Sequence, residues 1–141
     1  MEFRQPIDED NLRIARQSSN FARLLGVTVL QEDPDRLVAQ LKVTSSLLNR
    51  NGTLHGGAVM ALADHLGGTA TFLNLGPGEG TATSESKTNF FRPVPENDVV
   101  TTETTPLHRG RRTMVWETRI TRSDGKLAAI VTQTQMILRK D

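Results

Sequence analysis

Between residues 56 and 73 the apolar positions recur at the spacing of an α-helix. They form one stripe along the segment, made of Val59, Leu62, Leu66, Ala70 and Leu73. The opposite side gathers mostly small residues around a single carboxylate: Gly57, Met60, Ala61, Asp64, Gly67, Gly68 and Thr71. Because a glycine inside a helix costs up to about 1 kcal/mol relative to alanine, the two interior glycines indicate close packing. The pattern predicts a helix with protein on both sides and Asp64 at least partly buried.

The other segments carry the alternation of β-strands, apart from one further helix at the start. Residues 8–25 show a modest helical pattern that ends at Gly26. Alternating or β-rich runs predict six strands, at residues 27–31, 36–44, 81–92, 99–107, 112–122 and 126–138. Turn sequences such as Ser123-Asp124-Gly125 separate these runs. The predicted order is helix, two strands, long helix, four strands.

The alternation also predicts which face of each strand is buried. In residues 36–44 the buried face is made of Leu37, Ala39, Leu41 and Val43. In the last two strands the shared faces are Met114, Trp116 and Ile120, and Ala128, Ile130, Met136 and Leu138. The polar residues between them, many of them threonine, predict a sheet with solvent on its other side. A helix with one apolar stripe packs best if such a sheet curls around it, so we expect an α+β fold: a long central helix wrapped by a curved antiparallel sheet, with an extra N-terminal helix.

Length, charge and residue types narrow the function. The 141 residues suffice for one core, so we expect a single domain, 1–141, with the helical segment 1–26 packed on it. A net charge of +1 gives no general field for nucleic acid or an anionic membrane. The absence of cysteine excludes a thiol nucleophile, and three histidines without ligand spacing predict no metal. Residues 1–9 are acidic and polar, and no stretch reaches about 18 apolar residues, so we expect a cytoplasmic protein.

Candidate chemistry lies at the start of the central helix and two turns into it. Unpaired N–H groups and the positive end of the helix dipole at Gly56 and Gly57 suit an anion or a developing oxyanion. Asp64 lies on the same helix face as Gly57, roughly 10 Å further along the axis at 1.5 Å per residue. An ester-like group plus a water can bridge that span, which suits the hydrolysis of an acyl compound. The alternative is that Asp64 is a structural carboxylate with a cap or a basic partner.

The run Asn49-x5-His55-Gly56-Gly57-x6-Asp64 resembles the hotdog-fold acyl-CoA thioesterases, specifically the PaaI-like branch of the phenylacetate pathway. The segment Phe90-Phe91-Arg92-Pro93 and the turn at Gly110-Arg111 add to the resemblance, which covers nearly all of the chain after the first helix. The resemblance implies that the protein hydrolyses an acyl-CoA thioester to a free acid and coenzyme A. It also implies that Asp64 activates the hydrolytic water or attacks directly.

The resemblance assigns roles to the other site residues. The Gly57 N–H, with Asn49 nearby, matches the groups that polarise the thioester carbonyl, and His55 matches the residue that holds this loop in place. Thr83 falls where some members of the family carry a serine that positions the water. Gly56 lets the carbonyl oxygen approach because it has no Cβ. Thioester hydrolysis needs mainly a positioned base and an oxyanion site, so we expect no cofactor, and coenzyme A enters only as part of the substrate.

Substrate anchoring and assembly give two further expectations. Arg111 and Arg112 belong to the basic cluster at residues 108–112, which is either a solvated hairpin turn or a contact for the phosphates of coenzyme A. The resemblance favours the phosphate contact. A sheet that already covers the apolar stripe cannot also cover the small-residue face, so a second chain should cover it. We expect at least a homodimer, in which Asp64 acts on a thioester held by the partner's loop, and the resemblance implies a homotetramer of two such dimers.

Two other functions fit the same fold. A binding module would hold acyl-CoA or another apolar ligand without turnover, but such a module has no evident need for the Asp64 carboxylate. An acyl-CoA hydratase would carry a paired Asp and His before the helix, and this pair is not evident here. His65 points about 100° away from Asp64 on the helix, which favours a structural or interface role over a catalytic dyad. Ser84 and Ser86 lack the Gly-x-Ser-x-Gly elbow of serine hydrolases.

Overall fold

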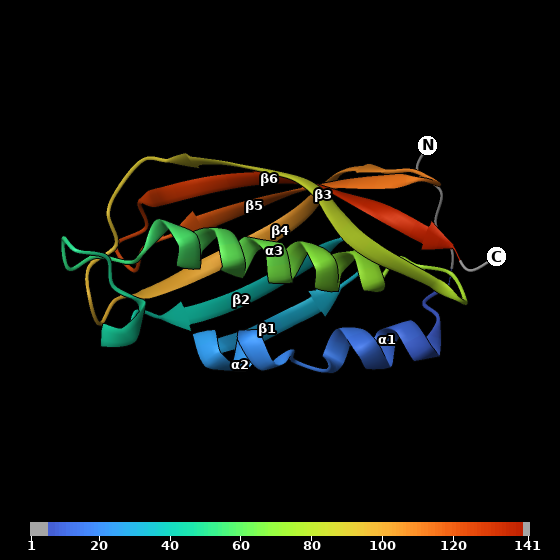
Figure 1. The fold of residues 1–141 in the computed structure, drawn as a ribbon, viewed down its shortest axis with the longest axis horizontal. Coiled ribbons are helices and arrows are strands. Elements are labelled where there is room, and N and C mark those ends of the chain that lie inside the picture. Colours follow the sequence, from blue (N-terminus) through green and yellow to red (C-terminus); the bar gives the residue numbers. More distant parts are fainter. Residues whose placement is uncertain (1–5, 140–141) are drawn as a thin grey trace.

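One antiparallel sheet and the long helix that it wraps dominate the computed structural model, which describes residues 6–139 (Figure 1). The strands are β1 (Val27–Asp33), β2 (Arg36–Lys42), β3 (Glu79–Phe90), β4 (Val99–Arg109), β5 (Thr113–Thr121) and β6 (Leu127–Arg139). Their order across the sheet is β1-β2-β4-β5-β6-β3, so β1 and β3 are its edges. All five pairings are antiparallel, which confirms the predicted α+β fold and its six strands.

The long helix α3 (Gly56–Phe72) buries its predicted apolar stripe against this sheet. Leu62 and Leu66 are fully shielded and belong to the same core cluster as Trp116 of β5. Burial of each such side chain stabilises the fold by about 1.5–3 kcal/mol. The indole N–H of the fully buried Trp116 donates to Thr71 Oγ1 on α3 at 2.9 Å. Thr71 therefore faces the protein's own sheet.

The N-terminal segment forms two helices, where the sequence pattern had predicted one over residues 8–25. They are α1 (Glu9–Arg16) and α2 (Asn20–Leu25). The break has a local cause, because Ser19 caps α2 by accepting the N–H of Ala22 at 3.0 Å. The buried Asn11 ties α1 to the end of α3 by donating to the carbonyl oxygens of Leu75 and Gly76. Residues 1–5 of the predicted segment 1–26 lie outside the described residues.

The predicted inner face is correct for β2 and β5 and, apart from the buried Ala128, wrong for β6. Leu37, Ala39, Leu41 and Val43 are buried, as are Met114, Trp116 and Ile120. On β6 the inner face is instead made of Ala129, Val131, Gln133 and Gln135, whereas Met136 and Leu138 are 46% and 47% exposed. Both faces of β6 carry apolar residues, so the sequence pattern is ambiguous there. The two buried glutamine amides are satisfied by hydrogen bonds, which allows polar side chains to point inward.

One of these amides explains a glycine of α3. A Cβ added at Gly67 would lie 2.1 Å from Nε2 of Gln133, whereas a Cβ added at Gly68 would meet nothing within 4 Å. Gly67 is buried against the protein's own sheet, so the prediction that it faces a second chain is wrong, as it is for Thr71. Asp64, predicted to be at least partly buried, is exposed in the single chain. The uncovered side of α3 is therefore narrower than predicted and centres on Met60 and Asp64.

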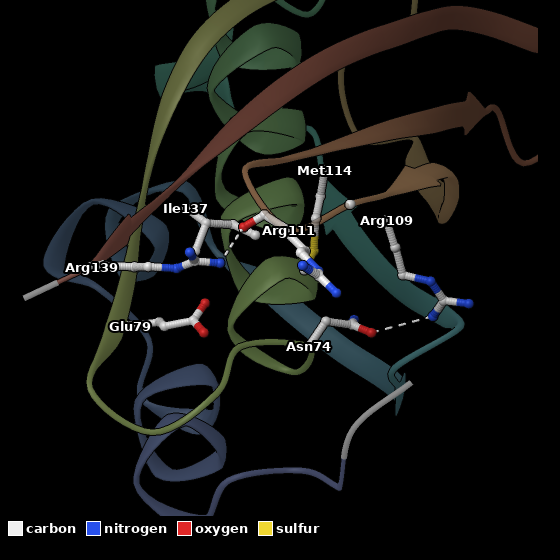
Figure 2. A pocket seen from close by; sticks show the side chains of 8 residues that line it. Asn74, Glu79, Arg109, Arg111, Met114, Ile137 and Arg139 are labelled. Carbon is white, nitrogen blue, oxygen red and sulfur yellow. Dashed lines mark hydrogen bonds between the residues drawn. The ribbon is translucent and has the colours of Figure 1, made fainter. Parts of the chain in front are cut away.

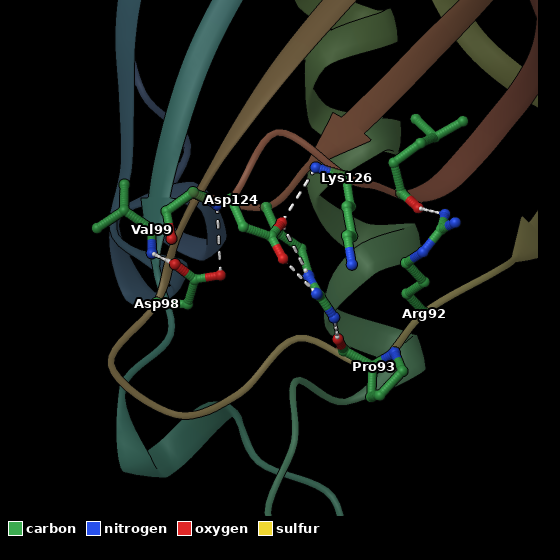
Figure 3. Close-up of polar contacts among 9 residues, drawn as sticks. Arg92, Pro93, Asp98, Val99, Asp124 and Lys126 are labelled. Carbon is green, nitrogen blue, oxygen red and sulfur yellow. Dashed lines mark hydrogen bonds and ion pairs between the residues drawn. The ribbon is translucent and has the colours of Figure 1, made fainter.

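The segment after β3 is tied to the β5–β6 turn by polar contacts (Figure 3). The Arg92 guanidinium donates to the Leu127 carbonyl at 2.7 Å, and Arg122 donates to the Pro93 carbonyl at 2.9 Å. Arg122 also pairs with Asp124, and this contact, together with the N–H of Lys126, lowers the pKa of Asp124 to about 2. These contacts fix the Phe90–Pro93 segment, which borders one of the pockets described below.

The two neighbouring glycines give a matched test of this packing. Gly67→Ala should lower the free energy of unfolding by about 1–3 kcal/mol, because the new methyl group displaces a buried amide from its hydrogen bonds. Gly68→Ala should be neutral or raise that free energy by up to about 1 kcal/mol, because alanine is the better helix former. Urea unfolding of both variants at one protein concentration measures the difference. Equal effects of the two substitutions would contradict the assignment of Gly67 to Gln133.

Candidate active site

The first part of the candidate site is the N-terminal end of α3. His55 is the N-cap residue of this helix, and its Nδ1 accepts the N–H of Gly57 at 2.8 Å. An imidazole that accepts at Nδ1 and is neutral carries its proton on Nε2. The Gly57 N–H, predicted as the oxyanion donor, is thus already engaged within the chain. The Gly56 N–H, in contrast, has no hydrogen-bond partner among residues 6–139.

The loop that leads into α3 is built around Asn49. The Asn49 side-chain oxygen accepts the N–H of Asn51 at 2.9 Å and that of Thr53 at 3.1 Å, and its amide nitrogen donates to Thr53 Oγ1 at 3.0 Å. The backbone N–H of His55 donates to the Leu47 carbonyl at 2.8 Å. Asn49 therefore shapes the loop that precedes Gly56, and the His55 side chain caps the helix.

A pocket of about 420 Å³ opens beside this loop. Asn49 and Gly56 line one side of it, and the apolar residues Phe90 and Phe91 line another. A Cβ at Gly56 would lie 3.3 Å from Cζ of Phe90, so the glycine keeps the space between the helix end and the ring open. Both phenylalanines are about half exposed in the single chain. This first pocket combines an apolar wall with the Gly56 N–H, for which the described part of the chain offers no partner.

The second part of the candidate site surrounds Asp64. Thr83 on β3 donates its hydroxyl to Asp64 Oδ1 at 2.6 Å, a short distance typical of a bond to a carboxylate. Both residues line a second pocket, of about 410 Å³, whose other walls include Ile14 of α1 and Phe72 of α3. The structure thus brings together Asp64 and Thr83, two residues that are 19 positions apart in the sequence.

His65 lines this second pocket as well, although the helical spacing predicted that it points away from Asp64. Burial lowers the pKa of His65, and the nearby charge of Asp64 opposes this effect without cancelling it. The imidazole is therefore neutral at neutral pH. Within residues 6–139 no hydrogen bond joins His65 to Asp64, so the two do not form a dyad.

The two pockets are separate in one chain. No residue of the Asn49–Gly57 loop lines the pocket of Asp64, and Asp64 does not line the pocket of Gly56. Gly57 and Asp64 lie on one rigid helix, seven residues apart, which sets them about 10 Å apart along its axis. In one chain, a thioester bound in the pocket at the N-terminal end of α3 therefore lies outside the pocket that Asp64 lines.

The basic cluster at residues 108–112 divides into structural and exposed arginines. Arg109 is buried and binds Asp35 at 2.7 Å and the Pro34 carbonyl at 3.1 Å, so it ties β4 to the β1–β2 turn. Figure 2 shows Arg111 with Arg139 and Glu79 around a third pocket, of about 360 Å³. Arg112 is exposed at the same turn. The part of the chain that the structure describes holds no group of three or more side chains placed to bind a metal ion.

One group in the site was missed by the sequence reading. Gln135 of β6 donates to Thr83 Oγ1 at 2.7 Å, although the sequence pattern placed Gln135 on a solvated face. An inward Gln135 is favoured by the alternation of the strand, which places it on the same face as Ala129 and Val131, but the residues of the outer face are equally apolar.

None of the helices in residues 6–139 is both long and apolar enough to cross a membrane.

Comparison with known proteins agrees with this architecture. Residues 51–129 match the family described as the thioesterase superfamily. A putative esterase from Pseudomonas aeruginosa, PA1618, is 31% identical over 137 residues, which cover 96% of this chain and 93% of that one. The crystal structure of a mutant of thioesterase PA1618 has a TM-score of 0.82 at 30% identity and covers 98% of this chain and 99% of that one.

Two further solved structures extend the comparison. A hypothetical thioesterase from Streptococcus pneumoniae, crystallised with coenzyme A, has a TM-score of 0.74 at 26% identity over 82% of this chain and 92% of that one. The PaaI protein of the E. coli phenylacetic acid degradation operon shows the same fold, with a TM-score of 0.81 at 23% identity over 94% of this chain and 92% of that one. The helix wrapped by an antiparallel sheet and these comparisons thus define a hotdog-fold thioester hydrolase. The chain belongs to the thioesterase superfamily.

Proposed function

We propose that this protein is an acyl-CoA thioesterase in which Asp64 acts as general base or nucleophile. The observation that carries the proposal is the carboxylate of Asp64, fixed by Thr83 on the open side of α3 and facing a pocket. A thioester needs no metal for hydrolysis, because its carbonyl is electrophilic and its leaving thiolate is weakly basic. In the general-base route, water attacks the carbonyl carbon while Asp64 takes its proton, the C–S bond breaks, and the thiolate of coenzyme A takes up a proton as the free acid leaves. In the nucleophile route, Asp64 attacks the carbonyl carbon, the C–S bond breaks to release the thiolate, and water then hydrolyses the acyl–Asp64 anhydride to the free acid and the regenerated carboxylate.

The N-terminal end of α3 supplies the oxyanion site in this proposal. The thioester oxygen would lie at the Gly57 N–H, beside the Gly56 N–H, which is without a partner in residues 6–139, where the helix dipole favours negative charge. To accept from Gly57, the oxygen must share its N–H with His55 Nδ1 or displace the imidazole. Asn49 sets the conformation of the loop that presents these groups. In this proposal Asn49 also helps to polarise the thioester carbonyl.

A complete site then needs two chains. If the N-terminal end of α3 in one chain faces Asp64 of a second chain, the two-fold axis passes midway between Gly57 and Asp64, beside Met60. Met60 is a large apolar side chain that is 39% exposed, as expected for a residue covered by a partner. The strand that carries Thr83, β3, is an edge strand of the sheet and can pair with its own copy. We therefore propose a homodimer as the active unit, a homotetramer of two such dimers as the assembly, and the cytoplasm as its location.

Coenzyme A would be anchored by the exposed arginines of the β4–β5 turn. Arg111 borders a pocket with Arg139, and Arg112 lies next to it in the turn, so their guanidinium groups are available to phosphates. The hypothetical thioesterase from S. pneumoniae was crystallised with coenzyme A, which supports the ligand class. The alternative function, a module that binds acyl-CoA without turnover, leaves the contact between Asp64 and Thr83 without a purpose.

Asp64→Asn tests the role of the carboxylate. Asparagine keeps the size and one hydrogen-bonding oxygen but cannot take a proton, so the fold and assembly should persist. On the best substrate from a panel of short, long and aromatic acyl-CoA thioesters, kcat should fall by at least ~10², with little change in KM. Glu96→Gln, which neutralises an exposed carboxylate on the turn before β4, is the control and should keep the parent rate. A folded Asp64→Asn protein within a few-fold of the parent kcat would refute the proposal, and a parent that binds thioesters without hydrolysing them would favour the binding module.

Replacing Arg111 and Arg112 together by alanine tests the anchor. Phosphate contacts far from the thioester stabilise the ground state and the transition state alike, so KM should rise while kcat stays close to the parent value. The increase should shrink as salt concentration rises, because exposed charges are screened. Arg23→Ala on α2, another exposed arginine, serves as the control. A KM that does not change at low salt would mean that the two arginines are only a solvated turn.

A further inference from the structure

A continuous chain of hydrogen bonds runs from the backbone of α3 through β6 to the Asp64 carboxylate. Gln133 Nε2 donates to the Ala63 carbonyl oxygen, and Gln135 Nε2 donates to Gln133 Oε1 at 2.7 Å. Gln135 Nε2 also donates to Thr83 Oγ1 at 2.7 Å, and Thr83 donates to Asp64 Oδ1 at 2.6 Å. Both glutamines are 1% exposed, so water does not compete for these bonds. This series of hydrogen bonds begins at Ala63 and ends at Asp64, two consecutive residues of α3.

The direction of every bond in this chain is fixed by its first member. A backbone carbonyl can only accept, so the Gln133 amide must present its nitrogen to Ala63 and its oxygen to Gln135. The Gln135 amide must then present its nitrogen to Gln133 Oε1 and, through its second hydrogen, to Thr83. Its oxygen faces the hydroxyl of Thr81 at 2.9 Å, and this hydroxyl lies equally close to the Met136 carbonyl oxygen. If the Gln133 amide were turned over, its oxygen would face the Ala63 carbonyl oxygen, and if the Gln135 amide were turned over, its oxygen would face Gln133 Oε1.

This direction determines where the proton of Thr83 points. A hydroxyl has one proton, and because Thr83 Oγ1 receives a hydrogen from Gln135, its own proton is left for Asp64 Oδ1. Asp64 Oδ1 is thereby occupied and its orientation held. The other carboxylate oxygen, Oδ2, has no hydrogen-bond partner within residues 6–139 and is the one left to act on a water or on the thioester.

We infer that Gln135 is a positioning residue for the hydrolysis, which acts through Thr83 to select the reactive oxygen of Asp64. The inference rests on the proposed function, because it requires Asp64 to do chemistry. Gln135 lines the same pocket as Asp64 but makes no hydrogen bond to it within residues 6–139, so its effect on the rate should depend on the hydroxyl group of Thr83. The same chain accounts for Gly67, since any side chain there would displace the Gln133 amide on which the sequence of bonds begins.

A double-mutant cycle on the full-length protein tests the inference. Gln135→Met keeps the approximate side-chain size and removes both donors, so kcat should fall by about tenfold or more while KM changes little. In a Thr83→Val background, which lacks the hydroxyl, the same substitution should change kcat by less than about twofold. In a Thr83→Ser background, which keeps the hydroxyl, the full effect of Gln135→Met should return. Gln40→Met on β2, where the amide bonds only to Thr101 within residues 6–139, is the matched control and should leave kcat unchanged.

The outcomes separate this inference from the proposed function. A parent protein that hydrolyses none of the thioesters would refute the function. An active parent whose kcat is unaffected by Gln135→Met would refute only the inference, as would an equal loss in the Thr83→Val and parent backgrounds, which would mean that Gln135 acts through the fold. If Gln135→Met does not fold, Gln133→Met tests the chain one bond earlier, because Gln135 can then turn over and present its oxygen to Thr83. That variant should also lower kcat in the parent background and leave it unchanged in the Thr83→Val background.

Discussion

The structure depends on one constraint: the apolar side of α3 must be covered, and the sheet covers only that side. Leu62 and Leu66 fill the space inside the sheet, which places the opposite side of the helix, with Met60 and Asp64, outside. Because helix and sheet are rigid elements, Asp64 and the N-terminal end of α3 are held at a fixed separation. The second chain in the proposed mechanism is inferred from the two separate pockets that this geometry creates.

The sequence pattern predicted the parts of the fold in which one periodicity dominates. The strict alternation at Leu37, Ala39 and Leu41 identified a buried face correctly, and the helical stripe identified α3. The pattern failed on β6, because both faces carry apolar residues and only tertiary hydrogen bonds decide that Gln133 and Gln135 point inward. It also missed the helix break at Ser19, where a side-chain cap outweighs a weak helical pattern.

The candidate site could be predicted only as far as its residues lie close in sequence. Spacing along α3 related Gly57 to Asp64, and the resemblance added Thr83, which the structure places against Asp64. The bond from Gly57 to the His55 imidazole was not foreseen, because capping by a histidine has no clear sequence signal. The same holds for Arg109, which looked like part of an exposed basic turn and is buried against Asp35. Each of these contacts is decided by side-chain geometry at distances that periodicity does not encode.

Complementation between two inactive variants tests most directly whether two chains build one site. Asp64→Asn removes the base, and Gly56→Val fills the space at the N-terminal end of α3 next to Phe90. If the carboxylate of one chain serves the helix end of the other, random hybrids of the two variants contain one intact site, and co-expression should restore up to about one quarter of the parent activity. Each variant alone should be inactive. Hybrids that form but remain inactive would contradict the shared site, because each chain would then need its own Asp64 and its own helix end.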